Sequence, residues 1–117
     1  MSNPIEEQRQ VIDQLYQIVK ASCPVGFQKA KCRFAYEKFE DGSSSVDQEF
    51  YFTKGDQEIS EVLDRDLRRS VMGLVKDLNA KMKAHTGGDW DAFTLFINED
   101  GTVTSKFEYP EEQQANG

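Results

Sequence analysis

The sequence predicts an α+β protein, a two-layer sandwich in which a four-stranded antiparallel sheet is covered on one face by two helices. Two stretches alternate apolar and polar residues with the period of two that a half-buried strand requires, and each folds back through an Asp-Gly turn. Two other stretches repeat apolar residues every three or four positions, as an amphipathic helix does. The predicted order is therefore helix, hairpin, helix, hairpin.

The first helix is predicted to begin at Asn3-Pro4, because asparagine is a good cap and proline suits the first turn. The residues expected on its buried side recur at helical spacing: Ile5, Ile12, Leu15, Tyr16 and Val19. Ser22-Cys23-Pro24 ends the helix, since proline disfavours helical geometry in the residue before it.

The first hairpin is predicted to run from residue 27 to residue 53. Its first strand, residues 27–39, has an apolar side made of Ala30, Cys32, Phe34 and Tyr36. Lys29, Lys31 and Arg33 fall on the other side of that strand. Asp41-Gly42 and three serines form the turn, and residues 46–53 form the returning strand.

The second helix is predicted to be the longest element. Lys54-Gly55-Asp56 ends the preceding strand, and either Asp56 or Ser60 caps a helix of about six turns. Its apolar positions are Val62, Leu63, Leu67, Val71, Leu74, Val75, Leu78 and Met82. The run His85-Thr86-Gly87-Gly88 ends it and supplies a glycine for the left-handed cap. Gly73 lies inside this helix, where either a close approach to another backbone or simple tolerance accounts for a glycine.

The second hairpin, residues 90–109, shows strand pattern, turn and strand pattern without a gap. Phe93, Leu95 and Ile97 alternate with Ala92, Thr94 and Phe96 before the turn, and Val103 and Phe107 continue the pattern after it. Asp100-Gly101 fits either a two-residue turn or a longer loop with a bulge at Gly101.

Length, composition and net charge limit the classes of function. The 117 residues fit a single domain, residues 1–112, followed by a frayed tail at 113–117. We expect a cytoplasmic protein, since the sequence shows no export signal and no apolar run long enough to span a bilayer. The net charge of −7 repels nucleic acid and anionic membranes, so a basic protein is the expected charged partner, although acidity also simply keeps a domain soluble.

The residue types that usually carry catalysis or bind metal form no recognisable site. Cys23 and Cys32 lack metal or redox spacing, and we expect free thiols. His85 is predicted to lie at a helix end, where a cation complements the dipole, and a nucleophile pair with Cys23 would need a third, orienting group. The acidic turn fails as a calcium loop, because Phe96 and Phe107 fall at ligand positions. We therefore predict no catalytic residue, metal or cofactor, and hence no enzyme.

A surface is the better candidate for function. The uncovered side of the sheet is expected to carry a partner-binding set: Asp47, Glu49, Tyr51, Asp91, Phe96 and Glu108. Aromatic side chains ringed by carboxylates suit a basic partner, because aromatic anchors dominate interface energies and rim charges accelerate encounter. Strict alternation also places Trp90 on this side, but packing under a helix or at the end of the sheet is an open alternative for Trp90 and Phe96, and it is favoured for Trp90.

The pattern Trp90-x-x-Phe93-x-Leu95-x-Ile97, an acidic turn ending in Gly101 and a strand closing on Phe107-x-Tyr109 resembles the YezG-like family of small bacterial immunity proteins. The likeness covers residues 11–112 through the same order of elements. This chain departs from the pattern by a shorter, serine-rich first turn and by Ser105. The resemblance implies a cytosolic antitoxin that binds the toxic C-terminal domain of a secreted or contact-dependent growth inhibition polypeptide, usually a basic nuclease. It implies no catalytic residues and no direct contact with nucleic acid or membrane.

Two other classes remain open. A small acidic secretion chaperone would bind one effector as an extended chain and would be a dimer, whereas an immunity protein binds a folded domain as a monomer or a homodimer. A small enzyme would require a deep pocket with clustered titratable groups.

Overall fold

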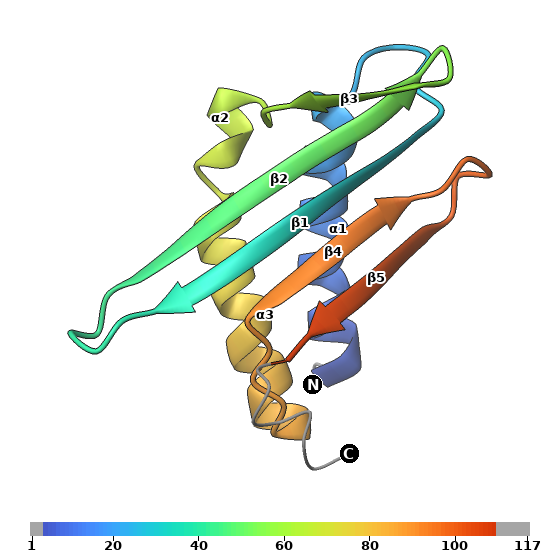
Figure 1. Cartoon of the computed structure of the whole chain (residues 1–117). Helices are drawn as coiled ribbons and strands as arrows, with labels where there is room; N and C mark the ends of the chain where they lie inside the picture. The colour runs from blue at the N-terminus through green and yellow to red at the C-terminus, as the bar shows by residue number, and fades with distance from the viewer. Residues whose placement is uncertain (1–3, 110–117) are drawn as a thin grey trace.

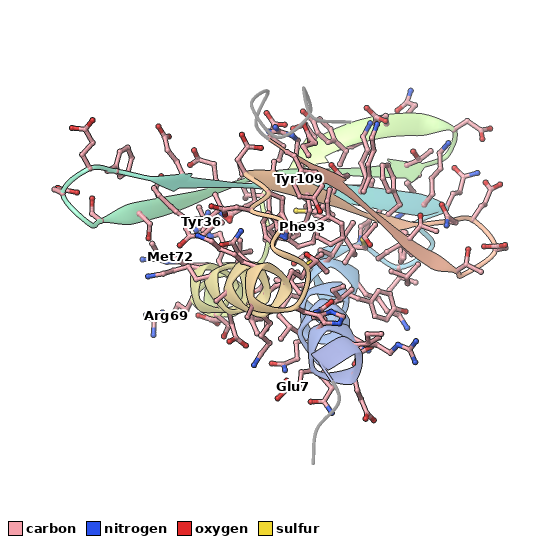
Figure 2. All side chains as sticks on the ribbon, turned by 90° about the horizontal axis from the view of Figure 1, so that it is seen from below. Glu7, Tyr36, Arg69, Met72, Phe93 and Tyr109 are labelled. Atoms are coloured by element: carbon pink, nitrogen blue, oxygen red, sulfur yellow. The ribbon has the colours of Figure 1, made fainter. Side chains whose placement is uncertain are left out.

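The computed structural model describes residues 4–109, which form one antiparallel sheet with helices packed on one of its faces (Figure 1). The elements in chain order are α1 (Pro4–Ser22), β1 (Lys29–Lys38), β2 (Ser44–Lys54), β3 (Gln57–Glu61), α2 (Arg65–Arg68), α3 (Val71–Thr86), β4 (Ala92–Ile97) and β5 (Val103–Glu108). The strand order is β3-β2-β1-β4-β5, so β1 is central. Helices α1 and α3 lie on the same side of the sheet, which leaves the opposite side open (Figure 2).

The predicted four-stranded sheet is wrong, because the segment expected to begin the second helix forms a fifth strand, β3. Gly55 and Asp56 both have positive φ, 61° and 62°, which is the requirement of the two-residue hairpin turn whose twist matches its strands. The chain reverses there, and Ile59 pairs with Phe52 of β2. All residues of β3 are exposed, so this strand lacks the alternation of apolar and polar residues by which a sequence predicts a half-buried strand. The protein is still a small α+β fold.

The second helix is consequently shorter than predicted and is interrupted. Leu63 is buried in the turn that follows β3, and Asp64, not Asp56 or Ser60, accepts a hydrogen bond from the backbone N–H of Asp66 at the start of α2. Helix α3 begins at Val71 and ends as predicted at Gly87, whose left-handed φ of 78° allows its N–H to donate to the carbonyl of Lys83.

The core lies between β1, its two neighbouring strands and the two long helices. On β1, Cys32 and Phe34 have no exposed surface, as their predicted side of the strand requires. Phe93 of β4 stacks on Phe34 with ring centroids 5.0 Å apart, and it also contacts Trp90 at 5.1 Å and Phe107 at 5.4 Å. These four rings join three strands into one aromatic cluster.

Helix α1 is rotated slightly from the predicted orientation. Leu15 and Val19 are fully buried as expected, but Val11 and Ile18 are buried as well, while Ile5 is 55% exposed. The predicted cap Asn3 and the predicted frayed tail, residues 113–117, lie outside the described residues.

Both long hairpin loops use the same turn chemistry. In the β4–β5 loop, Gly101 has φ of 89° and the Asp100 carboxylate accepts hydrogen bonds from the backbone N–H and hydroxyl of Thr102. The β1–β2 loop repeats this arrangement with Asp41 and Ser43. Because Ile97 pairs with Val103, the longer of the two turns open for the second hairpin is the correct one.

Asn79 ties the end of α3 to the start of β4. Its side chain is 3% exposed, and its amide donates to the Trp90 carbonyl at 3.0 Å and to the Asp89 carboxylate at 3.2 Å. Burial alone would raise the pKa of Asp89, but hydrogen bonds from Lys38 and Asn79, together with the charge of Lys83, outweigh that effect and lower it. This polar junction positions Trp90 in the core.

We predict that Asn79→Ala destabilises the protein by about 1–3 kcal/mol, because the buried Trp90 carbonyl would lose its donor. Urea unfolding monitored by tryptophan fluorescence measures the change. Asn98→Ala is the matched control, since the Asn98 amide donates to exposed threonine hydroxyls in the β4–β5 loop. An equal loss in both variants would show that burial of the junction is unimportant.

Gly73→Ala is predicted to stabilise the protein by about 1 kcal/mol, the usual difference between these residues inside a helix. A Cβ at Gly73 would meet nothing within 4 Å, so close backbone approach does not explain this glycine. A Cβ at Gly101 would also meet nothing within 4 Å, but Gly101→Ala is predicted to reduce stability by about 1–2 kcal/mol, because the φ of Gly101 is in the left-handed region. Thermal unfolding of both variants tests the contrast, which fails if the two shifts have the same sign.

Candidate functional site

The surface with the features of a binding site is the side of the sheet that the helices leave uncovered, which we call the open face. Its residues follow from the strand register, and they are Lys29, Lys31, Arg33 and Ala35 of β1, Asp47, Glu49, Tyr51 and Thr53 of β2, Glu58 and Ser60 of β3, Ala92, Thr94 and Phe96 of β4, and Thr104, Lys106 and Glu108 of β5. Figure 2 shows side chains rising from the sheet on the side away from the helices.

The six residues predicted to bind a partner all lie on or beside the open face, and five of them line two neighbouring depressions. The first, the acidic hollow, is lined by Asp47 and Asp91 with Arg33, Ala35, Tyr36, Glu37 and Lys38. The second, the aromatic hollow, is lined by Glu49, Tyr51 and Phe96 with Lys31, Arg33, Glu58 and Thr94. The sixth residue, Glu108, contacts Arg33, which lines both hollows.

A bulge at the start of β4 explains why Asp91 reaches the open face and Trp90 does not. Ala92 is the register partner of Glu108, yet the backbone N–H of Asp91 also donates to the Glu108 carbonyl at 3.0 Å. Two residues therefore oppose one, and the alternation of sides shifts by one position. Strict alternation would place Trp90 beside Thr94 on the open face, but it is 1% exposed in the core. The alternative favoured for Trp90 is thus the correct one, whereas Phe96 is half-buried on the open face.

An ion pair spans the width of β4. The Arg33 guanidinium donates to both carboxylate oxygens of Glu108, at 2.8 and 3.2 Å, although β4 lies between their strands. Adjacent strands are about 4.8 Å apart, so the two side chains must reach across roughly 10 Å of sheet. Ala92, in the same row as Glu108, has the small side chain that leaves room for this bridge and is itself 1% exposed.

The charges of the bridge reinforce each other. The hydrogen bond from Arg33 holds the pKa of Glu108 below its usual value, and the hydrogen bond to Glu108 raises the pKa of Arg33. The nearby charges of Glu49 and Asp91 raise the pKa of Arg33 further. Arg33 is therefore a permanent cation at the centre of the open face.

Lys31 is the second cation at the centre of this face. It pairs across the sheet with Tyr51 on one side and Phe96 on the other. Its ammonium leans toward β3, where it lies 5.3 Å from the centroid of the Tyr51 ring and 3.7 Å from the Glu58 carboxylate. The open face is thus mixed in charge, and its aromatic side chains are not ringed by carboxylates alone as the sequence suggested.

The prediction of site residues omitted Lys31 and Arg33, although a signal was present. Both lie on the side of β1 opposite Cys32 and Phe34. In a sheet covered on one face only, that is the solvent-exposed side, where a functional surface is expected. What the sequence did not show was that β1 is the central strand, which places these cations between the carboxylates of β2 and Glu108 of β5.

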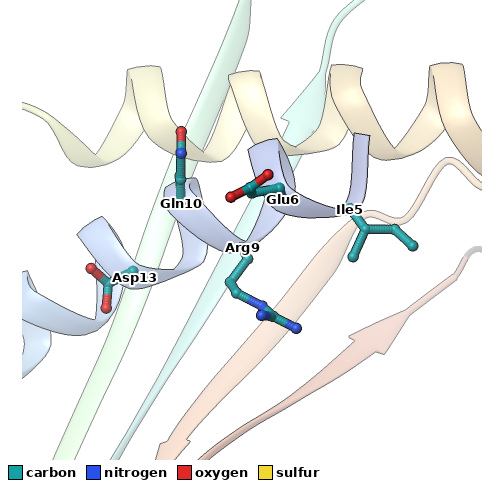
Figure 3. Close-up of a pocket in the computed structure, with 5 residues that line it drawn as sticks. All are labelled: Ile5, Glu6, Arg9, Gln10 and Asp13. Carbon is teal, nitrogen blue, oxygen red and sulfur yellow. The ribbon is translucent and has the colours of Figure 1, made fainter. Parts of the chain in front are cut away.

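The other candidate regions show no convergence of groups. A depression on α1 is lined by Ile5, Glu6, Arg9, Gln10 and Asp13, all from one helix, and Figure 3 shows the side chains of Arg9 and Gln10 leaving it in opposite directions. Burial raises the pKa of Cys23 to about 11, and its thiol donates to the Val19 carbonyl. His85 contacts Gln8 near the start of α1, whereas Cys23 follows the end of that helix. At 1.5 Å per residue, Gln8 and Cys23 are roughly 20 Å apart, so His85 and Cys23 do not form a nucleophile pair.

Within residues 4–109, no group of three or more His, Cys, Asp or Glu side chains is arranged to hold a metal ion. None of the helices in that range is both long enough and apolar enough to cross a bilayer.

Comparison with known proteins gives one partial similarity. No protein-family model matches the chain. Over 78 residues, or 67% of its length, the chain is 38% identical to a protein of Stenotrophomonas maltophilia named "Chorionicgonadotropic hormone-like protein". The matched segment spans 18% of that longer protein. The similarity does not bear on the resemblance to YezG-like immunity proteins, which stays a prediction.

Glu108→Gln is predicted to reduce stability at neutral pH and to have no effect in acid. The folded-state pKa of Glu108 is lowered, so the bridge to Arg33 contributes fully above the unfolded pKa of about 4.3 and is lost as the pH falls through the lower folded value. Both side chains are 40% exposed, so the expected contribution is below about 1 kcal/mol. Urea unfolding at pH 7 and pH 3 measures it, with Glu99→Gln in the exposed β4–β5 loop as control. A difference from the wild type that does not shrink between pH 7 and pH 3 would show that the substitution acts through packing.

Proposed function

We propose that this protein is an immunity protein, an antitoxin that uses the open face of its sheet to bind and cover the toxic domain of a secreted or contact-delivered polypeptide. The observation that carries the proposal is the gathering of two aromatic rings, Tyr51 and Phe96, with five carboxylates on a sheet face that the helices leave uncovered; the carboxylates are Asp47, Glu49, Glu58, Asp91 and Glu108. The resemblance to YezG-like proteins supports the same function.

The open face has the properties that favour tight binding. Its side chains stand on strands joined by continuous backbone pairing, so little conformational freedom is lost when a partner docks. Tyr51 and Phe96 are half-buried on either side of Lys31, which belongs to the central strand β1, and they supply aromatic contact area there. Immunity needs an affinity near nanomolar, which corresponds to about 12 kcal/mol of binding free energy.

Electrostatics would act at two ranges. The net charge of −7 draws a basic toxin domain toward the protein from a distance. At contact, cations on β1 alternate with carboxylates on the flanking strands, so the partner must present a matching pattern of charge. The proposed mechanism is occlusion of the active site of a basic toxin, with a nuclease as the expected class, and specificity set by this pattern.

The direct experiment first asks whether the gene immediately upstream of this chain encodes a secreted polypeptide, and then uses the C-terminal domain of that polypeptide. Co-expression with this protein is expected to restore growth, and the purified folded domain is expected to form a nanomolar complex. Absence of such a neighbour, or failure of its folded domain to bind, would reject the proposal. Binding of an extended segment alone would identify a secretion chaperone instead.

The double charge reversal Asp47→Lys with Glu49→Lys is predicted to slow association with that domain roughly tenfold at low salt, because charge steering governs encounter rates. Stopped-flow kinetics at several salt concentrations measures the effect, which should shrink as salt increases. Glu6→Lys with Asp13→Lys is the matched control, since these exposed carboxylates lie on α1, on the helical side (Figure 3). Equal slowing by both pairs would show that net charge matters and the open face does not.

A further inference from the structure

The aromatic hollow is built around a cation that belongs to the protein itself. Tyr51, Lys31 and Phe96 form one row across β2, β1 and β4. Two strand spacings of about 4.8 Å separate the bases of the two rings, which leaves the width of one side chain between them. Lys31 stands in that interval, with its ammonium over the Tyr51 ring and beside Glu58.

The two cations that line this hollow are drawn toward opposite edges of the sheet. Lys31 leans toward β3 to reach Glu58, and Arg33 reaches over β4 to Glu108. Glu49 is the cross-strand neighbour of Arg33, yet the Arg33 guanidinium is bound to Glu108. Among residues 4–109, Glu49 therefore has a cation nearby but no ion pair.

The aromatic hollow between these side chains has a volume of about 420 Å³, and its lining includes Phe96, Tyr51, Thr94 and Glu49. An aromatic ring, a hydroxyl and a carboxylate around one space are the groups that hold a planar cation, through ring stacking and charge-assisted hydrogen bonds. The contact of Lys31 with the Tyr51 ring shows that this surface already accommodates a positive charge.

We propose that the aromatic hollow receives an arginine side chain of the protein partner, and that Lys31 occupies part of that site in the free protein. This inference deepens the proposed function and rests on it, since it names the group by which a basic toxin domain is anchored. The guanidinium stacks on Phe96 and pairs with Glu49, and Lys31 gives way over the Tyr51 ring while it stays beside Glu58.

Arginine fits the hollow better than the alternatives. Its planar guanidinium stacks on an aromatic ring and presents several donors in one plane, whereas a lysine ammonium is a compact, strongly hydrated point charge. An acidic side chain would meet Glu49 and Glu58, and both central cations are already paired with carboxylates. A basic partner is also the one that the net charge of −7 attracts.

The test titrates N-acetyl-arginine methylamide into the intact chain and follows the ring resonances of Tyr51 and Phe96 by NMR. We expect saturable shifts of both rings. Lys31→Met is expected to tighten binding about fivefold, the factor that corresponds to a like-charge repulsion of about 1 kcal/mol at 4 Å in water. Glu49→Gln is expected to weaken binding by a similar factor.

Lys81→Met is the matched control, because Lys81 is also a partly exposed lysine in a surface ion pair, with Asp77 on α3 at 3.6 Å. It should leave the affinity within about twofold of the wild type, since exposed charges farther apart than about 10 Å are largely screened. Equal tightening by both lysine variants, or no tightening by Lys31→Met, would overturn the proposal. Equal binding of N-acetyl-lysine methylamide would overturn the choice of arginine.

The probe does not require the toxin, so the two proposals can fail separately. If the arginine probe behaves as expected but the folded toxin domain does not bind, the immunity function is rejected and the cation site stands. If the toxin domain binds and Lys31→Met weakens the complex, the cation site is rejected and the immunity function stands.

Discussion

The alternation of side chains along the central strand β1 is the constraint on which the rest of the structure depends. Cys32 and Phe34 face the helices without exposed surface, and this fixes the register of β2 and β4 on either side, because a slip of one residue would carry every apolar side chain to the open face. The same constraint directs Lys31 and Arg33 outward. The basic stripe at the centre of the open face is therefore a direct consequence of core packing.

The bulge at Asp91 and Ala92 is the one place where that alternation is broken, and it serves both layers. On the core side it turns Trp90 inward, where its ring contacts Phe93 and Phe107. On the open side it presents the Asp91 carboxylate near Arg33. Asn79 holds the chain just before the bulge by binding the Trp90 carbonyl, so helix α3 takes part in setting the geometry of the open face.

The charges on the open face form cross-strand pairs that span more than one strand. Arg33 reaches over β4 to Glu108 and Lys31 reaches past β2 to Glu58. Such exposed pairs contribute little to stability, but within residues 4–109 they determine which carboxylates have no ion pair and can be engaged by a partner. Because Asp47 and Glu49 are among those carboxylates, the proposed function depends more on the arrangement of charges than on their sum.

The sequence alone predicted the amphipathic α1, the end of α3 at Gly87 and both long hairpins, because each depends on residues close together in the chain. It also identified six surface residues that the structure brings to one face. It missed β3, because all the residues of this strand are exposed and show no alternation of apolar and polar residues. The Gly55-Asp56 turn also has the composition of a strand end followed by a helix cap. Tertiary structure alone decided the strand order, the bulge that buries Trp90 and the pairing of Arg33 with Glu108. Each of these depends on which strands become neighbours, and that choice is made by packing between segments far apart in the sequence.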